Sequence, residues 1–70
     1  MDKQKRTANE LEDIVKQRIG AGDFKVTVHH DPQAGWRATI YGRQQAEVRR
    51  CQLVADTIAV ELCQHYDLNG

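Results

Sequence analysis

The sequence predicts an α+β fold: a two-layer αββα sandwich in which an antiparallel β-hairpin packs against two helices. Three observations support it. Apolar residues recur at helical spacing near the start, alternate in two central runs, and return to helical spacing towards the end. The chain has 70 residues, which fits one small domain. We therefore expect a flexible basic tail over residues 1–6 and a single αββα domain over residues 7–70.

The first helix is predicted over residues 8–19. Thr7 and Glu10 have the spacing of a capping box, in which the hydroxyl accepts from the N3 amide and the carboxylate accepts from the cap amide. Gly20 follows the last apolar position, and glycine is typical just after a helix C-terminus. The apolar residues at helical spacing are Leu11, Ile14, Val15 and Ile19.

The central part of the chain predicts a β-hairpin. Two runs of alternating apolar and polar residues flank the loop sequence Asp31-Pro32-Gln33-Ala34-Gly35. The expected register places the apolar residues on one face, and a slip by one residue would mix the faces. On the apolar face it pairs Phe24 with Gly42, Val26 with Ile40, Val28 with Ala38, and His30 with Trp36. On the polar face it pairs Lys25 with Tyr41, Thr27 with Thr39, and His29 with Arg37.

A second helix is expected from about Gln44 to Asp67, because this stretch contains neither glycine nor proline. Its predicted apolar side consists of Val48, Cys51, Val54, Ala55, Ile58, Ala59, Leu62 and Tyr66. A helix of this length would extend about 36 Å, whereas a seven-residue strand spans about 23 Å. We therefore expect one end of the helix to overhang the sheet.

Two features predict a homodimer. Both strands of a lone hairpin are edge strands with unpaired backbone groups, so a second copy could extend the sheet to four strands. The second helix also carries Ala46, Leu53 and Val60 at seven-residue spacing on the side opposite its apolar face. This line is either a set of isolated exposed apolar residues or a seam for another helix.

The charges suggest a partner-binding surface. Ten Lys and Arg balance ten Asp and Glu, which argues against a tight, sequence-blind nucleic-acid binder. Residues 36–50 nevertheless carry a net charge of +3, and residues 51–70 carry −3. The candidate partner-binding residues are Lys25, Arg37, Tyr41, Arg43, Arg49 and Arg50. A weak nucleic-acid-binding face built from these cations and one stacking ring is the alternative to a protein-binding face.

No catalytic, cofactor or metal site is predicted. His29 and His30 are adjacent in a strand and point to opposite faces, and Cys63 and His65 lie about 200° apart on a helix. Cys51 and Cys63 would be about 18 Å apart on one helix, beyond the reach of a disulfide. Both thiols also lie far from a helix N-terminus, where the helix dipole would favour a thiolate.

The sequence predicts neither a membrane span nor a secretory signal. Residues 1–6 are charged and no apolar segment follows them, so we expect a cytoplasmic location. Together these patterns predict a small, non-enzymatic binding or interaction module that needs no cofactor and forms a homodimer.

Overall fold

A computed structural model describes residues 3–20, 22–33 and 35–69, and it confirms the α+β class. The helices are α1 (Ala8–Ile19) and α2 (Gln45–Cys63). The hairpin consists of β2 (Phe24–Asp31) and β3 (Gly35–Gly42), and a second, smaller sheet consists of β1 (Gln4–Arg6) and β4 (Tyr66–Leu68).

The first helix begins and ends where its sequence predicts. The Thr7 hydroxyl accepts from the Glu10 amide at 3.2 Å, and the Glu10 carboxylate accepts from the Thr7 amide at 3.3 Å. Gly20 ends the helix with a φ of +106°, a region that favours glycine. Its amide donates to the Lys16 carbonyl at 3.0 Å, so one of the last helix carbonyls is satisfied.

The hairpin has the predicted register at every pair from Phe24 with Gly42 to His30 with Trp36. The apolar side chains of the apolar hairpin face are buried under both helices, whereas His30 and Gly42 at the two ends of that face are exposed. The polar face is mostly exposed. The buried core consists of Leu11, Val15, Phe24, Val26, Val28, Trp36, Ala38, Ile40, Cys51, Ala55, Ile58, Ala59 and Leu62.

The second helix is shorter than predicted. It ends at Cys63, and the chain then turns into β4, where Tyr66 lies in a strand and not on a helix face. Val54, also predicted on the apolar face, is 41% exposed. A 19-residue helix extends about 28 Å and an eight-residue strand about 26 Å. The expected overhang is therefore wrong.

Residues 4–6, which the sequence pattern assigns to the basic tail, lie in a short strand. They form β1, which pairs in parallel with β4, and the Gln4 amide donates to the His65 carbonyl at 3.1 Å. The Arg6 guanidinium lies 5.5 Å from the centre of the Tyr66 ring, within reach of a cation–π contact. Residues 1–2 lie outside the described part of the chain.

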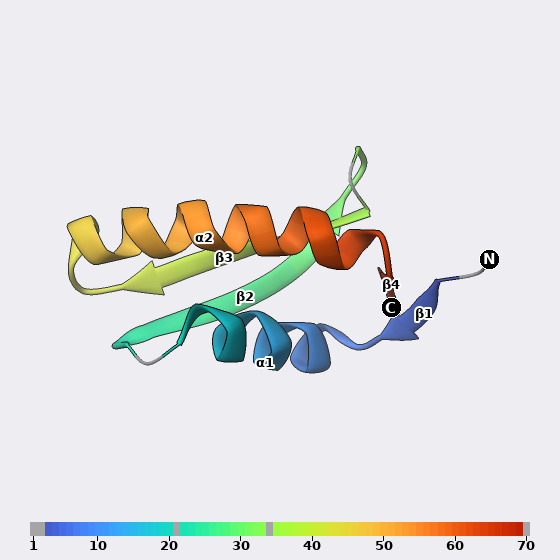
Figure 1. The fold of residues 1–70 in the computed structure, drawn as a ribbon, viewed down its shortest axis with the longest axis horizontal. Helices are drawn as coiled ribbons and strands as arrows, with labels where there is room; N and C mark the ends of the chain where they lie inside the picture. The colour runs from blue at the N-terminus through green and yellow to red at the C-terminus, as the bar shows by residue number, and fades with distance from the viewer. Residues whose placement is uncertain (1–2, 21, 34, 70) are drawn as a thin grey trace.

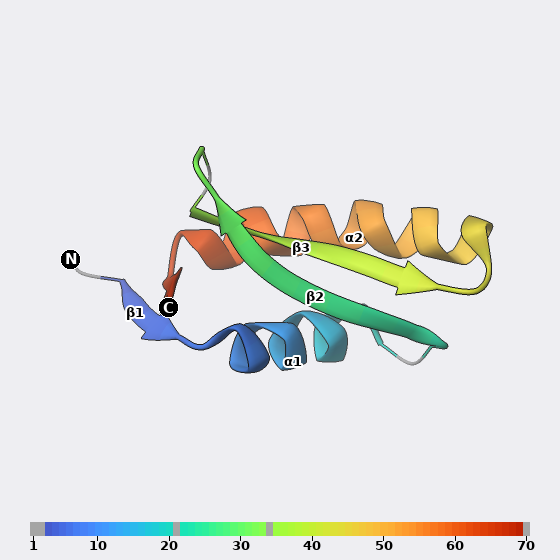
Figure 2. The ribbon, with the colours of Figure 1, turned by 180° about the vertical axis from the view of Figure 1, so that it is seen from behind.

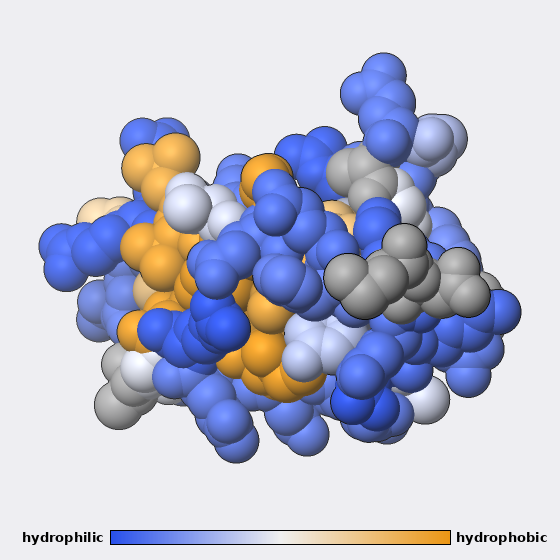
Figure 3. All heavy atoms as spheres, turned by 45° about the vertical axis from the view of Figure 1, so that its right-hand side comes forward, coloured by the Kyte–Doolittle hydropathy of each residue, from blue (hydrophilic) through white to orange (hydrophobic). Residues whose placement is uncertain are grey.

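Figure 1 shows both helices in front of the hairpin, with α2 along β3 and α1 along β2; Figure 2 shows the hairpin from behind. The molecule is elongated, with extents of 39 × 20 × 18 Å. Apolar side chains gather in the region between the helices in Figure 3. Within residues 3–20, 22–33 and 35–69, no helix has the length and apolar character needed to cross a membrane.

Candidate functional site

Helix side chains cap both outer edges of the hairpin. On the β2 edge, the Glu12 carboxylate of α1 accepts from the Val28 amide at 2.9 Å. On the β3 edge, the Gln52 side-chain amide of α2 accepts from the Ile40 amide at 2.9 Å and donates to the Ala38 carbonyl at 3.0 Å. Pairing with a second sheet would have to displace these side chains, so the caps disfavour a four-stranded sheet between two copies.

These caps are absent from the sequence prediction. Glu12 and Gln52 occupy positions where a polar residue would ordinarily mark the solvated flank of an amphipathic helix. They can cap a strand only because α1 and α2 lie close to the strand edges. The distance between a helix and a strand edge cannot be predicted from a local sequence pattern. The residue type is nevertheless suitable, because one glutamine amide can serve both a donor and an acceptor of an edge strand.

The polar face of the hairpin brings some of the predicted partner-binding residues together. Lys25 and Tyr41 are directly paired, and Arg43 follows β3 at the same end of the hairpin. Tyr41 is 56% exposed, so its ring is accessible to a partner. Arg37 lies about 14 Å further along β3, where its Nε is 3.4 Å from an oxygen of Asp31.

Arg49 and Arg50 do not belong to that face. They are exposed on α2, which packs on the opposite, apolar side of the sheet. The six predicted residues therefore form no single platform. Lys25, Arg43, Arg49 and Arg50 share one property: none takes part in an ion pair within the described segments.

The outer side of α2 exposes the predicted apolar line. Leu53 is 71% exposed and Val60 is 66% exposed, and Ala46 is also exposed. Among the described residues, Leu53 and Val60 are the two most exposed large apolar side chains. Figures 1 and 2 show α2 along one long edge of the molecule, with no other helix or strand over most of its outer side.

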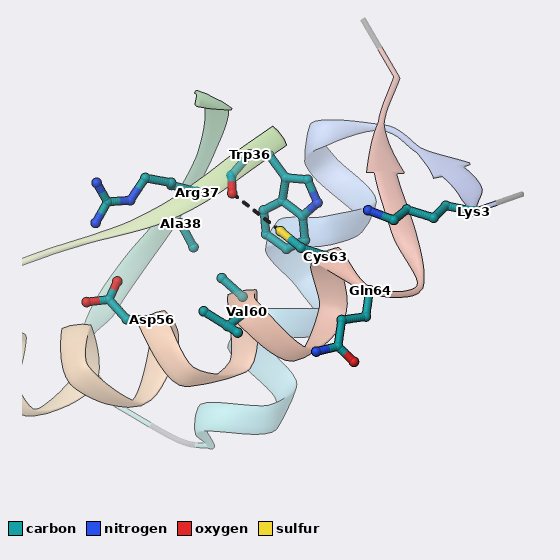
Figure 4. Close-up of a pocket in the computed structure, with 9 residues that line it drawn as sticks. Lys3, Trp36, Arg37, Ala38, Asp56, Val60, Cys63 and Gln64 are labelled. Atoms are coloured by element: carbon teal, nitrogen blue, oxygen red, sulfur yellow. Dashed lines mark hydrogen bonds between the residues drawn. The ribbon is translucent and has the colours of Figure 1, made fainter. Parts of the chain in front are cut away.

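A groove of about 540 Å³ lies between β3 and α2, and no pattern in the sequence predicts it. Figure 4 shows Asp56, Val60 and Cys63 along α2, with Trp36 and Ala38 opposite on β3. The groove is lined by Lys3, Trp36, Arg37, Ala38, Asp56, Ala59, Val60, Cys63 and Gln64. It exists because β3 is an edge strand with α2 alongside, a juxtaposition that only the tertiary structure creates.

Cys63 is the one thiol that lines this groove. Its Sγ donates to the Trp36 carbonyl at 3.5 Å (dashed line in Figure 4). Desolvation by burial raises the pKa of Cys63 above its ordinary value and outweighs the lowering effect of this hydrogen bond. The thiol therefore acts as a weak structural donor, and its environment is opposite to that of an activated nucleophile.

No family model, curated protein or solved structure matches this chain. Among the described residues, no three His, Cys, Asp or Glu side chains gather closely enough to hold a metal ion. The candidate sites are thus three surfaces: the exposed line Ala46, Leu53 and Val60, the adjoining groove, and the polar hairpin face.

Proposed function

We propose that this protein is a non-enzymatic interaction module that works as a homodimer, and that two copies associate through the exposed side of α2. The observation that carries the proposal is the exposure of Leu53 and Val60 on one helical line. A second helix can pack against large apolar side chains that are aligned on the outer face of a helix. The capped strand edges favour this route over sheet extension.

The apolar line is short, which predicts a weak association. Burying a Val or Leu side chain contributes about 1.5–3 kcal/mol. Because Leu53 and Val60 are 71% and 66% exposed before association, the four such side chains of two copies would contribute about 4–8 kcal/mol. The cost of association is about 4–15 kcal/mol. The dimer should therefore form in a concentration-dependent manner.

The cysteines also bear on the compartment that we propose for this protein. Both are free thiols, which fits the cytoplasm.

Sedimentation velocity over a concentration series tests the proposal. The wild-type chain should shift from the mass of one copy to that of two as concentration rises. The Leu53→Glu variant should stay monomeric, because it would place two carboxylates at the centre of the interface. Gln17→Glu adds the same charge on the exposed surface of α1 and should dimerise like the wild type. A wild-type chain that is monomeric at every concentration would refute the proposal.

A second candidate function is weak binding of single-stranded nucleic acid at the hairpin end. Lys25, Tyr41 and Arg43 favour it, because they place two cations without an ion pair beside an exposed ring. The test is fluorescence anisotropy of a labelled single-stranded RNA. Binding should weaken steeply with salt and should decrease on Lys25→Glu substitution. Binding that is absent at low salt would exclude this function.

A further inference from the structure

We infer that the two copies pack with their α2 helices antiparallel about a two-fold axis at Leu53, so that Arg49 of each copy pairs with the partner's Asp56 across the mouth of the groove. This inference rests on the proposed self-association and specifies its geometry. It commits to a second copy of this chain as the occupant of the exposed side of α2.

Two parallel rows run along the outer side of α2. Ala46, Leu53 and Val60 form the apolar row at seven-residue spacing, and such a row drifts only about 20° per repeat. Arg49 and Asp56 are also seven residues apart, and each lies about 60° around the helix from the apolar row. This second row is on the flank towards β3, because Asp56 lines the groove and accepts from Gln52, the residue that caps the β3 edge.

Symmetry makes these rows self-complementary. In a two-fold antiparallel pair centred on Leu53, each residue faces the position equally far from Leu53 in the opposite direction along the partner helix. Leu53 then meets Leu53, and Ala46 meets the partner's Val60, so a small side chain faces a larger one. The apolar rows of the two copies therefore cover each other along their whole length.

The same two-fold rotation brings each charge of the second row opposite a charge of the other sign on the partner helix. A two-fold axis perpendicular to the plane of the two helices keeps each flank on its own side of the pair while it reverses the helix direction. Arg49 lies four residues before Leu53 and Asp56 three residues after it. The two residues therefore reach levels that differ by only about 1.5 Å along the helix axis. The dimer contains two such pairs.

Both members of the pair are available in the single chain. Arg49 is exposed, and the ion pairs of the described residues include neither Arg49 nor Asp56. Asp56 accepts from the Gln52 amide through Oδ1 at 2.9 Å, which leaves its other oxygen for a guanidinium. By contrast, Glu61 on the other flank of α2 is already engaged with Arg18 at 3.3 Å. Asp56 is thus the acidic residue of α2 best placed to attract a second copy.

Arg50 provides the matched control. It is adjacent to Arg49 and also exposed, but it lies on the flank away from β3. In the two-fold arrangement its nearest counterpart is the partner's Thr57, which carries no charge. Reversing the charge at Arg50 therefore changes the net charge as much as reversing it at Arg49, without acting on the proposed pair.

The test is a charge-swap series measured by sedimentation equilibrium, with circular dichroism to confirm folding. Arg49→Asp and Asp56→Arg should each weaken dimerisation about tenfold, because two attractive contacts become two repulsive ones. The Arg49→Asp/Asp56→Arg double variant should recover dimerisation to within about threefold of the wild type. Arg50→Asp should change it by less than about threefold.

The outcomes separate this geometry from the self-association on which it rests. If Leu53→Glu abolishes the dimer while Arg49→Asp leaves it unchanged, the dimer stands and this geometry is overturned. A double variant that is no better than the worse single variant would also overturn it. A wild-type chain that stays monomeric overturns both.

Discussion

At the residue scale, Trp36 connects the core of the hairpin with β4 and with the end of α2. Its side chain is 1% exposed, its indole N–H donates to the Tyr66 carbonyl at 3.1 Å, and its own carbonyl accepts from the Cys63 thiol. The alternation of the β3 sequence predicts that the ring faces the core opposite His30, which the structure confirms. Its contact with Tyr66 could not be predicted, because it depends on the chain leaving the helix before residue 66.

Replacing Trp36 with alanine should cost about 3–5 kcal/mol of unfolding free energy, since it removes a large buried ring and leaves a cavity. A small domain has a total stability of about 5 kcal/mol, so the variant should keep only about 0–2 kcal/mol and be partly unfolded at room temperature. Urea denaturation followed by circular dichroism measures this. Tyr41→Ala removes an exposed ring of the same hairpin and should change the free energy by less than about 1 kcal/mol. A Trp36→Ala protein that loses less than about 1 kcal/mol would show that this core assignment is wrong.

Cys63 should react slowly with an alkylating reagent in the folded protein. Burial raises the pKa of its thiol, and only the thiolate is the nucleophile. At a fixed pH the folded chain therefore contains less Cys63 thiolate than the unfolded chain, and the rate should increase only at a higher pH. The pH profile of iodoacetamide alkylation in a Cys51→Ala background, with and without urea, measures this. A profile in the folded protein at or below the pH range of the unfolded chain would contradict the assigned environment.

At the element scale, the sequence predicts those elements whose signals are local. The first helix has a capping box at one end and a glycine at the other, and alternation fixes the hairpin register through the burial of one face. The end of α2 has no glycine or proline, and the three-residue strands β1 and β4 have no pattern of their own. Those strands form because segments about 60 residues apart in the sequence pair their backbones, which is information that no window of sequence contains.

The caps of the hairpin edges are also features of element packing. The Gln52→Ala substitution removes the side-chain partner of the Ile40 amide and of the Ala38 carbonyl on the β3 edge. An edge group that loses its partner costs about 1–3 kcal/mol where water does not replace it, so Gln52→Ala should be less stable by about that amount. Denaturant unfolding measures the difference. Gln64→Ala, an exposed glutamine just after α2, is the matched control and should unfold like the wild type. Equal stability of both variants would show that the cap contributes nothing.

At the scale of the whole molecule, the candidate surfaces divide into those that a sequence pattern can reveal and those that it cannot. Seven-residue spacing identified Ala46, Leu53 and Val60, and the structure confirms that all three are exposed. Charge clustering brought Arg37, Arg49 and Arg50 together with Lys25, but the fold separates them because helix and hairpin expose different sides. The groove between β3 and α2 has no sequence signal, since its two walls belong to different elements.

The surfaces of the molecule therefore differ in how well they are covered. Both strand edges carry side-chain caps, the apolar side chains of the apolar hairpin face are buried, and the outer side of α2 keeps two large apolar residues in solvent. A small domain buries only about 60% of its unfolded surface, so burial against a second copy would add to a limited core. We therefore propose that a second copy covers the outer side of α2.

Disulfide trapping at position 53 tests whether two copies associate through α2. In a background without the native thiols (Cys51→Ala and Cys63→Ala), Leu53→Cys should form a disulfide-linked dimer on mild oxidation. In the proposed dimer, residue 53 would meet its own counterpart at the two-fold axis, where packed helices bring α-carbons within the roughly 4.4–6.8 Å that a disulfide spans. Asn9→Cys on the exposed surface of α1 should crosslink far more slowly at the same concentration. Equal, slow crosslinking at both positions would contradict association through α2.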